Sequence, residues 1–208
     1  RKVFETKAEN VSAPIIYAQD NNYIISSQPT DDGGREYKTK CFGVLRGVLG
    51  GTYQEKNLNT ILNSLLPLAR SLKKKGLFPM PVGCDKQENT LLDMLRVALT
   101  EVCNMTGLSG RWHILQQQPL VICDTGHNLA AWQYLSKQIT FVAELRKKKN
   151  KRSNLRIVFG MVDDKDVKAV LDLLPPKAYY YFTQAYTHRA IPADRICQLA
   201  TERGLQGQ

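Results

Sequence analysis

The sequence predicts an α/β protein built from two parts, and three observations carry this prediction. Short apolar runs of strand length alternate with apolar positions at helical spacing along the 208 residues. From residue 119 onward the alternation is regular, because three strand patterns are each followed by a helix pattern. Three successive β-α units predict a mostly parallel sheet with right-handed crossovers. The part before residue 107 is mixed, so we expect two domains, each with its own core.

The first part combines strand signals with two long amphipathic helices. We expect a short helix over 3–10, strands over 14–19, 21–28 and 35–47, and helices over 57–75 and 90–105. The turn-forming stretch TDDGG separates the second and third of these strands, and Gly76 ends the first long helix, which runs through Pro67.

The second part follows a turn-rich and then polar stretch, which we expect to join two domains. We therefore divide the chain into residues 1–110, a joint at 111–118 and a second domain over 119–208. We expect strands over 119–124, 155–162 and 178–185 and helices over 129–145, 166–174 and 193–203, with residues 121–123 and 157–159 in central strands. Another strand is expected after Gly204, so the second domain looks truncated.

Composition excludes several classes of protein. Apolar residues make up 43% and charged residues 23% of the chain, and the longest apolar runs are too short to cross a bilayer, so no membrane is expected. The stretch RKVFETKAEN lacks the apolar segment of a signal peptide. The five cysteines are odd in number and far apart, without a C-x-x-C pair. Reduced, mostly buried thiols in a cytoplasm fit this pattern.

The net charge of +10 comes largely from two basic runs, Arg70 with residues 73–75, and residues 146–152. Both follow predicted helices, where cations complement the helix dipole and stay solvated. No aromatic interleaving or nucleic-acid motif accompanies the runs, so we expect no specific binding of nucleic acid. A positive field also attracts phosphates and carboxylates, which favours a cleft for anionic small molecules.

The stretch PLVICDTGHNLAAW places Asp124, His127 and Asn128 between a strand and a helix. Ligands of open α/β sheets bind at the carboxyl ends of strands, so these side chains are candidates for a binding site. The alternative is a buried strand followed by an ordinary helix cap.

Three further segments carry candidate residues. GVLGGTYQEKN has the glycines of a phosphate loop without Gly-Lys-Ser/Thr, and it offers Gln54 and Asn57 as amides for the edge of a base, or simply as a polar helix start. In GLSGRWHIL, Arg111 is suited to clamp a phosphate, or is a surface arginine. In GMVDDKD, Lys165 and Asp166 follow a predicted strand, where the acidic residues also favour a helix N-terminus.

The order of these motifs is more specific than any one of them. G-x-x-Q-x-x-N, G-R-W, D-x-x-H-N, G-x-x-x-D-K-D and then R-A-I-P at residues 189–192 resemble folylpolyglutamate synthase/dihydrofolate synthase, which is similar to the muramyl-peptide ligases. The resemblance covers nearly the whole chain, and G-R-W with DTGHN is its most specific part. A muramyl-peptide ligase would more usually show His-Asn where Tyr53 and Gln54 stand.

The resemblance implies the rear part of a P-loop-type ATPase domain, the central domain of Mur ligases, followed by a Rossmann-like C-terminal domain. It implies an ATP-dependent amide ligase that activates the γ-carboxylate of a reduced folate, or the carboxylate of dihydropteroate, as an acyl phosphate. L-Glutamate then attacks, and Mg²⁺ offsets charge on the transferring phosphoryl group. The parent enzyme is expected to be a cytoplasmic monomer without nucleic-acid or membrane partners.

The resemblance also suggests roles for residues. Gln54 and Asn57 resemble nucleotide-base contacts, Arg111 the catalytic arginine that reaches the ATP phosphates, and Asp124 the carboxylate near the ribose. His127 resembles a catalytic imidazole near phosphate and incoming glutamate. Asn128, Lys165 and Asp166 match the substrate side of the cleft.

The family's phosphate loop, Mg²⁺ ligands and carbamylated lysine have no counterpart in these 208 residues, so we expect a fragment that is inactive alone. A muramyl-peptide amino-acid ligase, a non-catalytic nucleotide- or folate-binding module and a basic nucleic-acid-binding protein stay open as alternatives. The choice between dihydrofolate synthesis, folate-tail extension and both is also open.

Overall fold

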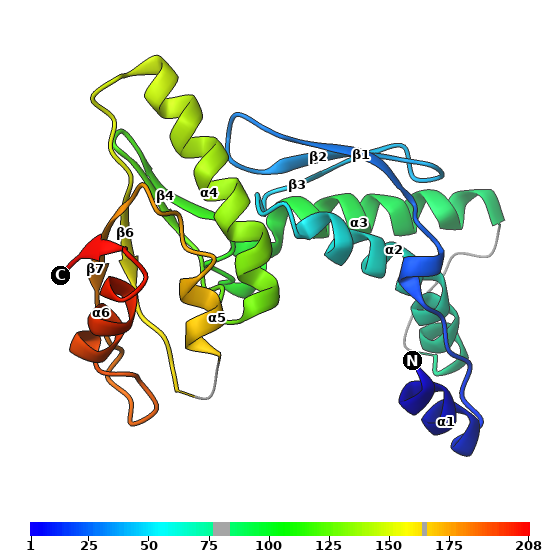
Figure 1. The fold of residues 1–208 in the computed structure, drawn as a ribbon. Coiled ribbons are helices and arrows are strands. Elements are labelled where there is room, and N and C mark those ends of the chain that lie inside the picture. Colours follow the sequence, from blue (N-terminus) through cyan, green and yellow to red (C-terminus); the bar gives the residue numbers. More distant parts are fainter. Residues whose placement is uncertain (77–83, 164–165) are drawn as a thin grey trace. The chain divides into compact units, whose positions relative to one another are not determined.

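The computed structural model describes residues 1–76, 84–163 and 166–208. The chain forms two compact units (Figure 1). The first comprises Arg1–Gly50 and Gln54–Leu120, and the second comprises Gly51–Tyr53 and Val121–Gln208. The three-residue segment Gly51–Tyr53 thus belongs to the second unit, although the rest of that unit begins only at Val121. The assignment of the two units to an ATPase domain and a Rossmann-like domain stays a prediction.

The first unit is a small antiparallel sheet with long helices. Its elements are α1 (Lys2–Asn10), the 3-10 helix η1 (Ala18–Asp20), β1 (Ile24–Pro29), β2 (Arg35–Thr39), β3 (Val44–Gly47), α2 (Gln54–Lys74), α3 (Cys84–Thr106) and β4 (His113–Gln117). The strand order is β1-β2-β3, with Tyr37 opposite Ser27 on one side and opposite Leu45 on the other.

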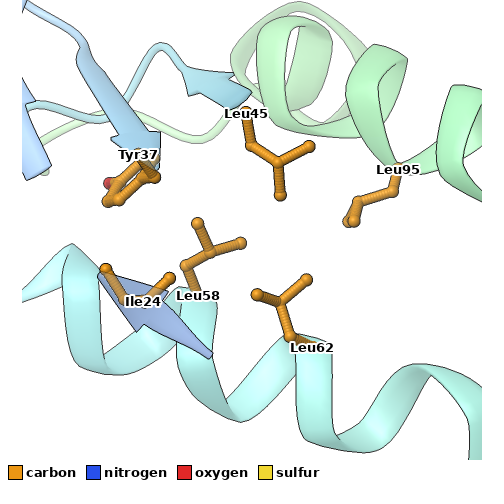
Figure 2. Close-up of a cluster of buried hydrophobic side chains, with 6 residues drawn as sticks. All are labelled: Ile24, Tyr37, Leu45, Leu58, Leu62 and Leu95. Carbon is orange, nitrogen blue, oxygen red and sulfur yellow. The ribbon is translucent and has the colours of Figure 1, made fainter. Parts of the chain in front are cut away.

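The core of this unit joins all three strands to both long helices. The strands and helices bury side chains toward one cluster, shown in Figure 2: Ile24, Tyr37, Leu45, Leu58, Leu62 and Leu95. Leu45 has no exposed surface. Because Leu58 and Leu62 are four residues apart, they lie on one face of α2 and pack together against the sheet.

The second unit is built on a parallel sheet. Its elements are β5 (Leu120–Cys123), α4 (Leu129–Lys149), β6 (Arg156–Phe159), α5 (Val167–Leu171), β7 (Tyr179–Phe182), α6 (Ala193–Thr201) and β8 (Gln206–Gly207). Strands β6, β7 and β8 are parallel neighbours in that order, with Ile157 opposite Tyr180. The predicted α/β class with a mostly parallel second sheet is therefore confirmed.

Several predicted details of the secondary structure were wrong. Residues 14–17 form no strand, and the predicted strand over 35–47 is two strands, β2 and β3. Strand β4 lies in the stretch predicted as an irregular joint. Strand β5 is not part of the sheet that β6, β7 and β8 form. A β-α alternation predicts where strands occur, but long-range pairing decides which strands become neighbours.

The thiols also differ from expectation. Cys41 is exposed and Cys103, Cys123 and Cys197 are partly exposed, and all four are free. The expectation of mostly buried thiols was therefore wrong for the cysteines whose side chains are described. No helix in the described ranges is both long and apolar enough to span a membrane.

Tyr37 links the core of the first unit to pH. Burial raises the pKa of its hydroxyl to about 12, against the lowering effect of nearby Arg35. An unfolded tyrosine ionises near pH 10, so between about pH 10 and pH 12 only the unfolded form releases this proton and the first unit loses about 2–3 kcal/mol of stability.

We expect Tyr37→Phe to remove that part of the alkaline loss. The measurement is urea unfolding from pH 9 to pH 12 followed by the fluorescence of Trp112, which is buried in the first unit, in a Trp132→Phe background. A pH dependence that is the same with and without the Tyr37→Phe substitution would contradict the assignment.

Candidate functional site

The DTGHN turn, residues 124–128, connects β5 to α4 within the second unit. Asp124 begins the turn and is partly buried. Its Oδ1 accepts a hydrogen bond from the backbone N–H of Gly126 at 2.8 Å, and its Oδ2 accepts one from the hydroxyl of Tyr53 at 3.0 Å. The carboxylate is thus held from two directions.

Gly126 brings this turn directly onto α4. A Cβ at this position would lie 2.2 Å from Cδ1 of Leu135, which is almost fully buried. The indole N–H of Trp132 donates to the carbonyl of Gly126 at 3.1 Å, and the Trp132 ring packs edge-on against Phe159. A side chain at position 126 would therefore have to displace Leu135, and these contacts hold the turn against the helix and the sheet.

His127 is exposed at the start of α4. Its Nδ1 lies 3.1 Å from the carbonyl oxygen of Thr125. Because a carbonyl oxygen only accepts, this contact requires the hydrogen on Nδ1, and Nε2 of the neutral ring is then an acceptor. Packing of the ring inside a core would have excluded a role in binding, and the exposed ring does not have that arrangement.

Asn128 and Asp166 each cap a helix. The side chain of Asn128 accepts from the N–H of Ala131 at 2.9 Å at the start of α4, and Asp166 accepts from the N–H of Ala169 at 3.1 Å at the start of α5. The capping alternative is therefore observed for both residues, and their roles toward a substrate stay predictions. Lys165 lies outside the described residues.

Gln54 and Asn57 lie in the first turn of α2, in the first unit. The amide nitrogen of Asn57 donates to the carbonyl oxygen of Gln54 at 2.8 Å. Gln54 is buried and Asn57 is exposed. Gln54 thus keeps its amide nitrogen as a donor, and Asn57 keeps its amide oxygen as an acceptor.

A short relay fixes the first turn of α2 to the sheet. The guanidinium of the buried Arg35 donates through Nη2 to the hydroxyl of Ser27 at 2.7 Å, and this hydroxyl donates to the carboxylate of Glu55 at 2.7 Å. The Nε atom of Arg35 is buried without a hydrogen-bond partner among the residues that the structure covers. No pattern in the sequence indicated this relay, because its members come from β1, β2 and α2.

The glycine turn before α2 is packed against backbone of the same unit. A Cβ on Gly50 would lie 2.0 Å from the carbonyl oxygen of Gly33 and 2.9 Å from Cδ1 of Trp112. Trp112 is buried and has a positive φ of 54°, and it follows Arg111, which is partly buried. The G-R-W motif thus supports the glycine turn through its tryptophan.

Tyr53 is a further candidate residue that the sequence analysis missed. It was noted only as a departure from the muramyl-peptide pattern, yet its hydroxyl holds Asp124, 71 residues away in sequence. The neighbouring N–H of Thr52 donates to the side-chain oxygen of Gln138 in α4 at 2.8 Å. No local pattern in the sequence could have predicted these two contacts.

The candidate residues therefore fall into two groups. Gln54, Asn57 and Arg111 belong to the first unit, and Asp124, His127, Asn128 and Asp166 belong to the second. Across the described ranges, no group of three or more His, Cys, Asp or Glu side chains is arranged to hold a metal ion.

Comparisons with known proteins agree with the resemblance. No family model matches the chain. The dihydrofolate synthase/folylpolyglutamate synthase of Buchnera aphidicola subsp. Schizaphis graminum is 33% identical over 84 residues, which are 40% of this chain and 18% of that protein. The folylpolyglutamate synthase of Mycobacterium tuberculosis, solved with ADP and AMPPCP, matches all of this chain and 42% of its own, with a TM-score of 0.66 and 20% identity.

A third match has the same character. FolC of E. coli, solved with DHPP and ADP, covers 88% of this chain and 36% of its own, with a TM-score of 0.53 and 22% identity. The chain spans about a fifth of the length of the curated relative and roughly two fifths of each solved structure. The likeness to the solved structures establishes the fold, and the resemblance that the motifs predicted is confirmed. This chain is thus similar to dihydrofolate synthase/folylpolyglutamate synthase in part of its sequence and shares the fold of the matching part of these enzymes.

Proposed function

We propose that this chain is part of an ATP-dependent amide ligase that adds L-glutamate to a folate, to dihydropteroate or to both, through an acyl phosphate. The observation that carries the proposal is the DTGHN turn, in which a doubly held carboxylate lies beside an exposed imidazole at the start of a long helix. Similarity to enzymes of this activity in sequence and fold supports it.

The paired amides of α2 suit the base of ATP. Adenine presents the N6 amino group as a donor beside N1 as an acceptor. The amide oxygen of Asn57 and the amide nitrogen of Gln54 take no part in the hydrogen bond between these two side chains. They offer an acceptor and a donor, which complement the donor and acceptor of adenine. We propose that they recognise the base.

Asp124 suits a ribose. Its carboxylate is held by the N–H of Gly126 and the hydroxyl of Tyr53, and we propose that it accepts a hydrogen bond from a ribose hydroxyl. Arg111 is proposed to bind the phosphates, because a guanidinium donates two parallel hydrogen bonds to phosphate oxygens.

His127 is proposed to act at the reacting end of the nucleotide. With the hydrogen on Nδ1, its Nε2 can accept a proton from the ammonium group of incoming glutamate, which must be deprotonated before the nitrogen attacks. Asn128, Lys165 and Asp166 are proposed to line the substrate side. Mg²⁺ would neutralise charge on the transferring phosphoryl group, and we propose that its ligands lie outside this segment.

We also propose that the parent enzyme is a monomer of the cytoplasm. The four free thiols suit a reducing compartment.

The proposal is tested by ADP release. The full-length protein that contains this chain should release ADP only when ATP, Mg²⁺, a pterin substrate and L-glutamate are all present. The 208-residue chain alone should release none above background, because it contains no G-x-x-x-x-G-K-[ST] sequence to hold the β- and γ-phosphates.

Three results would contradict the proposal. Ligation by the isolated chain would show that the catalytic residues are misplaced. Nucleotide binding by the full-length protein without any turnover would indicate a non-catalytic binding module, and turnover only with muramyl peptides would indicate the related ligase class.

A further inference from the structure

The end of α4 carries a dense group of cations that the proposed reaction does not use. We call it the basic tip, and it consists of six exposed residues: Arg146, Lys147, Lys148, Lys149, Lys151 and Arg152. In the part of the chain that the structure describes, none of the six forms an ion pair with a carboxylate. The charge is therefore unneutralised by the fold.

A tight turn keeps all six cations together. The N–H of Asn150 donates to the carbonyl of Arg146 at 2.8 Å, and the side-chain oxygen of Asn150 accepts from the N–H of Arg152 at 3.0 Å. The chain thus bends at the helix end instead of leading the last two cations away. Successive helical residues are rotated by about 100°, so the four cations of the last helical turn surround the axis.

The helix dipole explains only a fraction of this charge. The carboxyl end of a helix is equivalent to roughly half a negative elementary charge, which one or two cations offset. Six cations leave a strong positive field at the basic tip, and such a field attracts a polyanion.

We propose that the basic tip binds a γ-linked oligoglutamate, the tail that the proposed ligase would build, and this inference rests on that proposed function. Each added residue contributes one carboxylate, so the product becomes a flexible polyanion. The surrounding stretch, residues 142–155, contains no aromatic residue on which a base could stack, which favours a carboxylate chain over a single-stranded nucleic acid.

The length of α4 sets which tails can reach the basic tip. The helix has 21 residues and is continuous in Figure 1. It therefore separates the DTGHN turn from the basic tip by roughly 31 Å. One γ-linked glutamate adds five main-chain bonds, which is about 6 Å when extended. A tail whose growing end lies at the DTGHN turn therefore needs about five residues to reach the basic tip. The basic tip would then hold long tails and leave short ones free.

The test is the binding of a fluorescent hexa-γ-glutamate to the 208-residue chain, measured by fluorescence anisotropy at low ionic strength without ATP. The triple substitution Lys147→Glu, Lys148→Glu and Lys149→Glu should weaken binding by about tenfold or more, because several exposed charge pairs are lost together. The neutral set Lys147→Gln, Lys148→Gln and Lys149→Gln should give a smaller loss, and it guards against damage to the helix end by reversed charges.

The chain offers a matched control at the end of α2. The control carries the substitutions Lys73→Glu, Lys74→Glu and Lys75→Glu, which also replace three exposed lysines. It changes the net charge of the chain by the same amount as the triple glutamate variant of the basic tip. Binding by this variant should stay within about twofold of the unmodified chain, since only the local field differs. Circular dichroism of each variant checks that the helices are retained.

Three results would overturn the proposal. These are no binding by the unmodified chain, an equal loss in the α2 control, or tighter binding of a single-stranded oligonucleotide or of anionic vesicles at equal charge. Because the assay needs no catalysis, absence of binding would remove the basic tip proposal alone, and failure of ligation in the full-length protein would leave this binding result unchanged.

Discussion

His127→Ala in the full-length protein is expected to lower the rate of ligation by about 10²-fold or more, as loss of a general acid-base group typically does. The affinity for ATP should change by less than about threefold. The reason is that the exposed ring forms a hydrogen bond through Nδ1 to the backbone of the same turn, whereas Asp124 and the helix cap of Asn128 are held by other contacts. Single-turnover formation of ligated product and calorimetric ATP binding measure the two quantities.

Two further variants make this prediction specific. His188→Ala removes another exposed imidazole of the second unit and should leave ligation unchanged. Arg111→Ala should weaken the steps that depend on phosphate, ATP affinity included, because its proposed partner is the phosphate chain. Unchanged ligation in both the His127 and the Arg111 variants would break the link between the two motifs and catalysis.

Gly50→Ala is expected to destabilise the first unit by about 1–3 kcal/mol, the usual cost of forcing extra volume into a packed site. The new Cβ would lie 2.0 Å from the carbonyl oxygen of Gly33, and a backbone atom cannot turn aside as a flexible side chain can. Relief would also push on Trp112, so the G-R-W segment and the turn before α2 should move together. Urea unfolding followed by Trp112 fluorescence in the Trp132→Phe background measures the change.

Gly47→Ala is the matched control for this substitution. Its added Cβ would meet Cε2 of Tyr37 at 3.6 Å, an ordinary contact, and Gly47 is also in the first unit. We expect it to change stability by less than about 1 kcal/mol, since alanine is also slightly better than glycine in a strand. Equal unfolding midpoints for the two variants would show that the turn is not constrained as described.

The helices were predictable because their signals are local. Asn128 caps α4, which begins at the next residue as expected, and Pro192 immediately precedes α6 at Ala193. Strand β4 was missed for the converse reason. His113–Gln117 is almost entirely exposed, and its two apolar residues are adjacent, so it shows none of the alternation that a half-buried strand produces. The apolar stretch over 14–19 has the composition of a strand but no strand partner.

The sequence by itself determined which chemical groups this protein carries and the order in which its motifs follow, and that order was enough to identify the resemblance. The capping bonds of Asn128 and Asp166 also follow from sequence, because each joins residues within one helical turn.

Only the tertiary structure showed that the hydroxyl of Tyr53 donates to Asp124 and that Ser27 connects Arg35 to Glu55. It also showed that β5 and β6 belong to different sheets. These contacts join residues far apart along the chain, and which of many such pairs forms depends on how the whole unit buries its apolar surface. A local sequence pattern therefore cannot predict which of these long-range contacts forms.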